Sequence, residues 1–541
     1  MKSIIKLAAF LFSCSFIISS CSSDWLKTSP TDSASGDEIF SSTENAKQAI
    51  NGLCKIMISQ HGRYGQSFNG EGSMKLLYGE YPGQDLNFPY MNPGWSPIMN
   101  GTITTNTTSK YNDYPWYYYY LIIGNANAII AKIDNAEGRE SERQFIKAEA
   151  LTFRAYAFSR LITVYCDNWS KSNKGTSNGI VLRVDESTGD IPLSTLAESY
   201  DQIYKDLDAA IDLYQKSGLT REEVYNKAAD TNCFPNENVA YAIYARAALD
   251  KEDYSNALKY AKLAKAGYPL MSVNDYRKGF AAPTSEWIWS IYNDENETIY
   301  YFGWQVFMAC NGNGANSSLN VCINKALIEQ FPETDIRKGL FLTESRFLPT
   351  GKTYLDVVAG DEAGSHNGEF SDQEAYDKAN DYVKSLIKSK QLPAGTPEQA
   401  FSYANLKFQA TAQPGVGCQP IIRSSEMVLI EAEANYHLNK ATDAQANLVE
   451  LNATSGRQPN YSCSKTNDEL LKEIKLYRRL ELFGEGFSWF DCKRWNDMVV
   501  REGFANGGNY YSSVAGNYGS KESFWKWSIP KRESDYNENI N

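Results

Sequence analysis

The sequence predicts a mainly α-helical protein, in which a tetratricopeptide-like scaffold of helical pairs carries long, loop-rich insertions with a few short strands. Two observations favour this fold class: apolar residues recur at helical spacing in several segments, and segments 61–116, 271–320 and 339–422 lack that period. These three segments are rich in Gly, Asn, Pro, Ser and Thr, yet too aromatic for disorder, so we expect an ordered loop layer.

Composition narrows the possible function. The chain has 541 residues, of which 53 are basic and 65 acidic, giving a formal net charge of -12. An acidic protein is repelled by a phosphate backbone, so we do not expect nucleic acid as a partner. There are 3 His residues and no Cys-x-x-Cys motif, which argues against a His-rich metal site, a zinc knuckle or a thioredoxin-type centre. We therefore expect no metal and no cofactor.

The start of the chain, 1–20, is predicted to be a lipoprotein signal peptide. Lys2 and Lys6 form a basic start, and the apolar run 4–18 is too short and broken to span a bilayer. It ends at Ile18-Ser19-Ser20-Cys21, which resembles a bacterial lipobox, so Cys21 is the predicted lipidation site. Several acyl chains, at about 0.8 kcal/mol for each buried methylene, make a durable anchor. The alternative is an ordinary secretory signal followed by an unrelated cysteine.

The first helical pair is expected at 117–133 and 144–165. A short polar turn, 134–138, joins the two segments, so they should fold back on each other. A third helix is expected at 195–214. The second helix shows the pattern most clearly, because its apolar residues alternate between spacings of three and four: Ala148, Leu151, Ala155, Phe158, Ile162 and Tyr165.

Residues 236–270 resemble a tetratricopeptide repeat, a helix–turn–helix unit of about 34 residues. Small residues such as Ala245 and Ala261 allow close approach of the two helices, and large ones such as Tyr244 fill the groove opposite. A looser version recurs at 424–452. A generic helical hairpin is the alternative for either segment, but such a unit alone cannot bury both of its faces, so several should stack.

The chain also shows a C-terminal block and several shorter stretches that point to one family. Residues 479–495 read RLELFGEGFSWFDCKRW, residues 148–156 read AEALTFRAY, and Ile529-Pro530 stands near the end. Together they resemble the SusD/RagB family of Bacteroidetes outer-membrane lipoproteins over nearly the whole chain. Two positions depart from the family pattern: Ser488 replaces a usually basic residue, and Cys492 replaces a usual Leu.

The resemblance implies a cell-surface, glycan-binding lipoprotein, lipid-anchored in the outer membrane and without catalytic activity. Such a protein captures oligosaccharides or polysaccharide and passes them to a SusC-like TonB-dependent transporter. A single SusD-like domain would then span 21–541. We expect its helical scaffold at about 40–60, 114–270 and 424–500. We expect its ligand-binding loop layer at about 61–113, 271–422 and 500–541, with short strands at 287–292 and 299–306.

Pyranose sugars present C–H faces that stack on aromatic rings and hydroxyl edges that pair with amides and carboxylates. The loops contain both kinds of residue. The candidate ligand-binding residues are Asp85, Asn87, Tyr90, Trp95, Asn100, Trp287, Tyr292 and Trp304. Each has a structural alternative: Asp85 is typical of turns, Trp287 lies in a strand-like alternation with one core face, and Trp304 lies in an apolar run.

The charged residues of the C-terminal block have two interpretations. Structural ion pairs that brace the last helices are favoured, with Trp489 and Trp495 as packing anchors. Catalysis by Glu481 and Glu485, four residues apart and facing the same way on a helix, is the weaker alternative. The charged residues in question are Arg479, Glu481, Glu485, Asp491 and Arg494.

Two other function classes stay open beside glycan capture. The same scaffold carries peptides in RagB-type members, and a surface glycoside hydrolase needs only carboxylates, which leave no local motif. Against an enzyme stands the absence of a Gly-x-Ser-x-Gly elbow, a His-Glu-x-x-His motif or a P-loop. Cys310 and Cys322, which bracket a Gly/Asn/Ser loop, are the cysteine pair to test first for a disulfide.

Overall fold

The computed structural model describes residues 39–65, 68–88, 95–293, 303–309, 321–341, 343, 381, 403–412 and 415–540. The predicted signal peptide, Cys21, Tyr90 and Cys310 lie outside these residues. Within them, no helix is both long enough and apolar enough to cross a bilayer.

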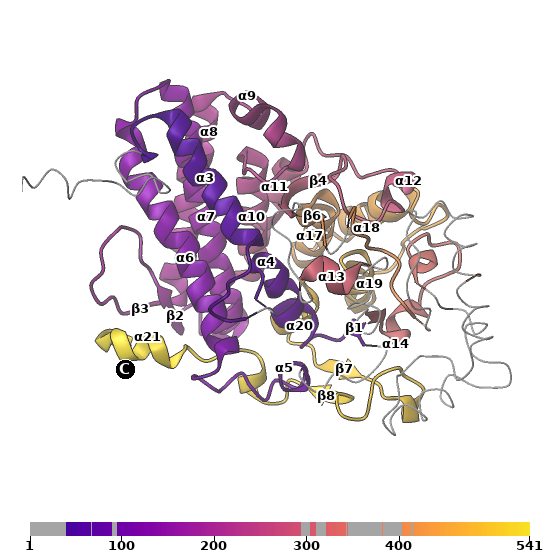
Figure 1. The fold of residues 1–541 in the computed structure, drawn as a ribbon. Coiled ribbons are helices and arrows are strands. Elements are labelled where there is room, and N and C mark those ends of the chain that lie inside the picture. Colours follow the sequence, from indigo (N-terminus) through magenta and orange to yellow (C-terminus); the bar gives the residue numbers. More distant parts are fainter. Residues whose placement is uncertain are drawn as a thin grey trace, which may run out of the picture.

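Long helices packed side by side form the bulk of the molecule, and irregular loops with short strands cover one end (Figure 1). This arrangement confirms the predicted fold class. The main helices are α3 (Thr43–Ile58), α6 (Lys110–Lys132), α7 (Glu140–Tyr165), α8 (Leu196–Ser217), α10 (Glu237–Asp250), α11 (Tyr254–Ala264), α17 (Ser424–His437), α18 (Ala441–Val449), α19 (Asn467–Glu481) and α20 (Ser488–Trp495).

The ends of the scaffold helices are set by local sequence. Thr195 and Glu198 form a capping box at the start of α8, in which each side chain bonds the other residue's backbone N–H. Gly218 ends α8 with a φ of 62°, a left-handed conformation that glycine adopts without strain. Asn236 caps α10 by accepting the Val239 N–H at 3.1 Å.

The predicted repeat-like pair is present as α10 and α11. Ala245, Ala248 and Ala261 are fully buried where the two helices approach, and the rings of Tyr244 and Tyr260 stack with centroids 3.8 Å apart. The second pair is α17 and α18, and α17 also packs on α11. The two pairs therefore form one continuous stack, although they lie far apart in the sequence.

The strands of the described residues form two-stranded antiparallel ladders. They are β1 (Leu86–Asn87) with β5 (Cys322–Ile323), β2 (Asn178–Val181) with β3 (Leu193–Thr195), β4 (Trp287–Asn293) with β6 (Gly417–Arg423), and β7 (Val499–Arg501) with β8 (Gly516–Tyr518). Strand β4 confirms the expectation at 287–292. The expected strand at 299–306 is wrong at its end, because Trp304–Met308 forms helix α13 and buries its side chains on all sides.

The loop layer contains more helix than the sequence suggests. Met74–Glu80 forms a π-helical segment, η2, in which every residue is buried. Because no face of this segment meets water, no amphipathic period marks it in the sequence. The other short helices are α4 (Gly70–Ser73), α5 (Ser96–Met99), α9 (Arg221–Tyr225), α12 (Val273–Tyr276), α14 (Lys325–Ile328) and α21 (Lys531–Tyr536).

The remaining helical segments are single turns. They are η3 (Ile133–Asn135), η4 (Trp169–Lys171), η5 (Asn226–Thr231), η7 (Lys338–Leu340), η9 (Glu450–Thr454), η10 (Phe504–Asn506), η11 (Glu522–Phe524) and η12 (Glu538–Ile540). Of these, η3 makes the predicted turn between α6 and α7. Helix α6 begins at Lys110, before the expected start at 117, because Ser109 caps it by accepting the Tyr111 N–H at 3.2 Å.

Candidate functional site

Two adjoining hollows flank the β7–β8 hairpin at the edge of the loop layer, beside α5 (Figure 1). One has a volume of about 610 Å³ and the other of about 590 Å³, and Asn517 lines both. We call them the hairpin hollows. The first is formed by residues 500–506 and 512–517, and the second by residues 100–105 and 517–524.

A buried arginine holds the hairpin in place. Arg501 is 1% exposed and donates hydrogen bonds to the backbone carbonyls of Pro82 at 2.7 Å, Gly83 at 2.8 Å and Met99 at 2.8 Å. Among the described residues, no carboxylate pairs with it, and burial lowers its pKa from the ordinary value. The guanidinium thus ties the hairpin to the main chain of segments from the first part of the sequence.

The walls of the hairpin hollows carry several polar side chains. The side chains of Thr105, Asn506 and Asn517 are exposed, and within the described part of the chain none of them has a hydrogen-bond partner. Asn100 follows α5 and donates from Nδ2 to the Ser513 carbonyl at 2.9 Å, which ties the wall of the second hollow to the loop between β7 and β8. The unpartnered amides and hydroxyl can therefore bond a ligand without breaking an existing contact.

Tyr518 supplies an aromatic surface at the second hollow. Its ring is half-buried, lies nearly parallel to Phe524 with centroids 5.8 Å apart, and has the Arg501 guanidinium 4.7 Å from its centre. The Tyr518 hydroxyl donates to the Val514 carbonyl at 3.1 Å, so the ring is fixed in orientation. A fixed ring beside the free amide of Asn517 is the combination that recognises a pyranose face and its hydroxyls.

Of the eight ligand-binding candidates, Asn100 lies in the wall of a hairpin hollow and Tyr292 is 38% exposed on β4, away from that site. Tyr90 falls outside the described residues. The structure does not bring Asn100 and Tyr292 together. For both, contact with a ligand stays a prediction.

The three tryptophan candidates lie in the interior. Trp95 is 5% exposed and packs on Tyr81 and Phe307, with centroids 5.4 and 6.3 Å away. Trp304 is 1% exposed and donates from Nε1 to the Gly484 carbonyl at 2.8 Å. Trp287 is fully buried in β4. Packing accounts for these three rings, so a ligand role for them is a prediction that the structure does not favour.

Asp85 and Asn87 are also interior. Asp85 pairs with Arg479, whose Nη2 is 2.6 Å from its Oδ1, and accepts the Ser488 hydroxyl at 2.9 Å. Asn87 is buried in β1 and donates to the Asn509 carbonyl. The nearby Cys322 has a free, buried thiol that donates to the Asn87 carbonyl at 3.4 Å, and its suggested partner, Cys310, is outside the described residues. Both candidates therefore hold loops together in this structure.

The hairpin hollows contain residues that sequence reasoning missed. Asn506, Asn517 and Tyr518 belong to the run 505–520, which reads ANGGNYYSSVAGNYGS. The run combines Asn and Tyr, the kinds of residue that marked Asn87, Tyr90 and Asn100 as candidates in segment 80–100. Applying that criterion to the C-terminal end of the chain would have found this segment.

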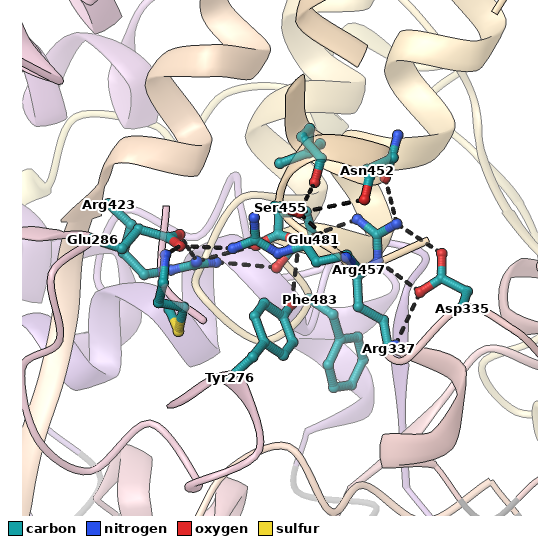
Figure 2. Close-up of polar contacts among 12 residues, drawn as sticks. Tyr276, Glu286, Asp335, Arg337, Arg423, Asn452, Ser455, Arg457, Glu481 and Phe483 are labelled. Atoms are coloured by element: carbon teal, nitrogen blue, oxygen red, sulfur yellow. Dashed lines mark hydrogen bonds and ion pairs between the residues drawn. The ribbon is translucent and has the colours of Figure 1, made fainter. Parts of the chain in front are cut away.

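Glu481 and Glu485 of the C-terminal block lie in a buried ion network, and Figure 2 shows the part of it around Glu481. Arg423 contacts Glu485 at 2.6 Å and Glu481 at 3.1 Å, and it also pairs with Glu286. Glu481 contacts Arg337 at 3.2 Å and Arg457 at 3.3 Å. Burial alone would raise the pKa of Glu481, but these three guanidiniums hold it well below the usual range.

The remaining charges of the block are paired as well. Arg494 contacts Glu433 at 2.8 Å and Asp491 at 2.9 Å, while Trp495 donates to Glu433 at 3.0 Å. The expected structural ion pairing is confirmed, although most partners come from outside the block. The expectation that Glu481 and Glu485 share a helix face is wrong, because α19 ends at Glu481. Ionised, enclosed carboxylates have neither a proton to donate nor contact with a substrate.

Two protein-family models match parts of this chain. A family model described as "SusD family" matches residues 285–540, and one described as "Starch-binding associating with outer membrane" matches residues 80–249. A curated relative, SusD-like protein P38 of Formosa agariphila, is 23% identical over 524 residues, which cover 91% of each chain.

Solved structures share the fold over nearly their whole length. A SusD-like carbohydrate binding protein from Bacteroides vulgatus has a TM-score of 0.71 and 20% identity, covering 93% of this chain and 98% of its own. A SusD superfamily protein from Bacteroides thetaiotaomicron has a TM-score of 0.67 and 21% identity, covering 92% and 99%.

Proposed function

The chain belongs to the SusD/RagB family, and from that membership we propose that it is a non-catalytic, cell-surface lipoprotein that captures oligosaccharides or polysaccharide. The observation that carries the proposal is the pair of hairpin hollows, which share the unpartnered amide of Asn517, with the unpartnered amide of Asn506 in the first and the oriented ring of Tyr518 in the second. A related solved protein is described as carbohydrate binding, and one matching family model as starch-binding, which supports a sugar as the ligand.

The size of the aromatic surface indicates weak capture. One pyranose face stacked on a ring removes roughly 80 Å² of apolar area from water, which contributes about 2 kcal/mol. Hydrogen bonds to exposed amides add about 1 kcal/mol each, against the entropy lost on association. With a few such bonds the gross gain is a few kcal/mol, so a dissociation constant in the millimolar range follows, and it suits a receptor that has to release its cargo.

Titration calorimetry of the full chain against neutral plant, fungal and host glycans tests the binding site. We expect the double variant Asn506→Ala/Asn517→Ala to weaken the best ligand about tenfold or more, since two hydrogen bonds are lost. Asn274→Ala, at an exposed asparagine of α12, is the matched control and should bind like the parent chain. Unchanged affinity in the double variant would remove the hairpin hollows from the proposal.

The same titrations separate the alternatives. Binding of peptides from a casein digest, with no response to any glycan, would favour a RagB-type peptide carrier. Release of new reducing ends from a bound polysaccharide would show a hydrolase. Neither result is expected, because the hollows offer amides and hydroxyls to a sugar. Glu502 is the one acidic residue in their described lining, whereas a glycoside hydrolase uses a pair of carboxylates, and the acidic residues of the C-terminal block are enclosed.

Membrane attachment and the partner are part of the proposal. The family model that matches residues 80–249 is described as associating with the outer membrane. We propose that residues 1–20 are removed, that Cys21 carries the acyl chains, and that residues 21–541 work as one domain with a SusC-like TonB-dependent transporter. Palmitate labelling should be lost in Cys21→Ala, and protease added to intact cells should degrade the parent chain. A tagged chain purified from outer membranes should carry a TonB-dependent transporter with it.

A further inference from the structure

A third hollow lies on another surface, where the start of α6 meets α21, the last α-helix (Figure 1). Its volume is about 430 Å³, and it shares no lining residue with the hairpin hollows. Its walls include the rings of Trp116, Tyr117, Tyr120 and Tyr536, together with Arg183 and Arg532. We call it the α6–α21 hollow.

The walls of this hollow are fixed by hydrogen bonds. Trp116 is buried and donates from Nε1 to Glu533 at 3.0 Å, which ties α6 to α21. The Tyr120 hydroxyl donates to the Val181 carbonyl at 2.7 Å, which ties α6 to β2. The backbone N–H of Lys531 donates to the Thr107 carbonyl at 2.9 Å. These hydrogen bonds hold the walls of the hollow in place within the fold.

Two aromatic rings remain available to a ligand. Tyr117 is half-buried on the outer side of α6, and Tyr536 is 80% exposed on α21. Single exposed apolar side chains are common, but here two accessible rings line one hollow together with the rings of Trp116 and Tyr120. The Tyr117 ring also packs against Tyr64 and His61, with centroids 5.2 and 5.9 Å away, so its remaining surface is the part open to a ligand. Such a surface suits the C–H face of a pyranose.

The charges around the hollow are unevenly satisfied. Asp113 accepts the Tyr64 hydroxyl at 2.7 Å, and Glu533 accepts the indole N–H of Trp116. By contrast, the described residues provide no carboxylate partner for Arg532 or Arg183, and Arg183 bonds only backbone carbonyls, including that of Gly189 at 2.9 Å. The carboxylates thus have hydrogen-bond donors, whereas the guanidiniums lack the acceptor that they pair with best.

A third guanidinium adds to this imbalance. Arg63 lies 5.5 Å from the ring centre of Tyr117 and also has no carboxylate partner among the described residues. Both Arg63 and Arg532 act electrostatically on the Tyr64 hydroxyl, so these two cations approach the same part of the surface. Two arginines and two acidic residues thus line the hollow, and Arg63 adds a third guanidinium beside it, on a protein whose formal net charge is -12.

From these rings and charges we infer that the α6–α21 hollow is a second saccharide site, selective for acidic sugars. The ring of Tyr117 covers one pyranose face, and Arg532 and Arg183 pair with a carboxylate or a sulfate of the same sugar. This inference goes beyond the proposed function, because it uses a surface that shares no residue with the hairpin hollows and assigns a ligand class that those hollows do not select.

The test compares charged and neutral probes of the same size on the full chain. Trigalacturonate, its methyl ester and a sulfated galactose disaccharide are titrated by calorimetry at low and at high salt. We expect saturable binding of at least one acidic probe, at least about tenfold weaker binding of the ester, and loss of affinity in salt. Binding of trigalacturonate alone identifies a uronate, and binding of the disaccharide alone identifies a sulfated sugar.

Variants place the binding in this hollow. Arg532→Gln should weaken the acidic probe about tenfold without changing the ester, and Tyr117→Ala should weaken both acid and ester. Lys531→Gln removes the same charge one position away, where the side chain pairs with Asp535, and should have no effect. Each variant is checked by its melting curve, because a binding loss counts only with an unchanged fold.

Several results would overturn the inference. They are equal affinity for acid and ester, equal behaviour of Arg532→Gln and Lys531→Gln, or no saturation by any acidic probe up to about 10 mM. The hairpin variant Asn506→Ala/Asn517→Ala should leave acidic binding unchanged. A loss of acidic binding in that variant alone would place the acidic site in the hairpin hollows. The proposed function would then stand, and the inference of a second site in the α6–α21 hollow would be refuted.

Discussion

Removing Arg423 should destabilise the protein strongly, because three buried carboxylates share its guanidinium. Figure 2 shows two of them, Glu286 and Glu481. In Arg423→Met, Glu286 keeps Arg457 at 2.6 Å and Glu481 keeps both Arg337 and Arg457. Glu485 is left with one cationic partner, Lys407, at 2.9 Å. The network loses its charge balance, since four cations currently face four anions: Arg337, Lys407, Arg423 and Arg457 against Glu286, Asp335, Glu481 and Glu485.

Breaking a buried ion pair from one side typically costs about 3–5 kcal/mol, and we expect a loss of unfolding free energy in that range. Urea denaturation followed by tryptophan fluorescence at pH 7 measures it. The double variant Arg423→Met/Glu485→Gln restores the charge balance and should recover at least about 1 kcal/mol. Arg139→Met, which removes an exposed guanidinium, is the control and should leave the midpoint unchanged.

The pH dependence has a definite sign. In the parent chain, Arg423 and Lys407 overcome the effect of burial and hold the pKa of Glu485 below the ordinary 4.5. A depressed pKa stabilises the fold above the unfolded value, and this contribution is lost as pH falls through the folded value. Without Arg423 the pKa of Glu485 should rise, so the deficit of the single variant should be smaller at pH 4 than at pH 7. A loss under about 1 kcal/mol, or a deficit that grows in acid, would refute the reasoning.

Three further outcomes are expected. Gly79→Ala should destabilise the fold by about 1–3 kcal/mol, because its Cβ would lie 2.3 Å from the Gly486 carbonyl oxygen. Gly124→Ala, with no atom within 4 Å, should stabilise α6 by about 0.5–1 kcal/mol. The urea midpoints of both variants test this, and an unchanged midpoint in Gly79→Ala would show that no such steric clash occurs. Arg501→Met should lower both the melting temperature and the glycan affinity, because the hairpin loses its backbone anchor. An unchanged affinity by calorimetry would show that the hairpin does not form the glycan site. Glu433→Gln should lower the unfolding free energy at pH 7 but not near pH 2, about where Arg494 sets the pKa of Glu433, and equal losses at both pH values would contradict that pairing.

The scaffold was predictable because its helices are long and their small and large apolar residues recur at spacings of three and four. The stripe from Ala148 to Tyr165 and the small-residue pattern around Ala245 marked α7 and α10 correctly. Segment η2 was not predictable, because a segment buried on every side carries no period. Strand β4 was recognised by its alternation, whereas Trp304–Met308 looked like a strand extension and is a helix.

The candidate site was harder to predict, because burial of a loop tryptophan depends on residues far away in the sequence. Trp95 follows Pro93-Gly94, a context typical of an exposed turn, yet Phe307 from a distant helix helps to cover its ring. Asn100 lies slightly further along the chain and lines a hairpin hollow. Composition therefore located one wall of the site, while the partner wall required the pairing of β7 with β8.

The anchoring of Arg501 to main-chain carbonyls has a consequence for engineering. Backbone oxygens are present whatever side chains surround them, so the anchor needs no particular side chain as its acceptor. Gly83 is still required, because a Cβ there would lie 2.4 Å from the Ser488 hydroxyl oxygen. Side chains that line the hollows, such as Asn506 and Asn517, make no contact with that anchor in the described structure. Libraries that randomise these lining positions should therefore yield folded receptors with altered preferences, in the way that antibody loops vary on a constant framework.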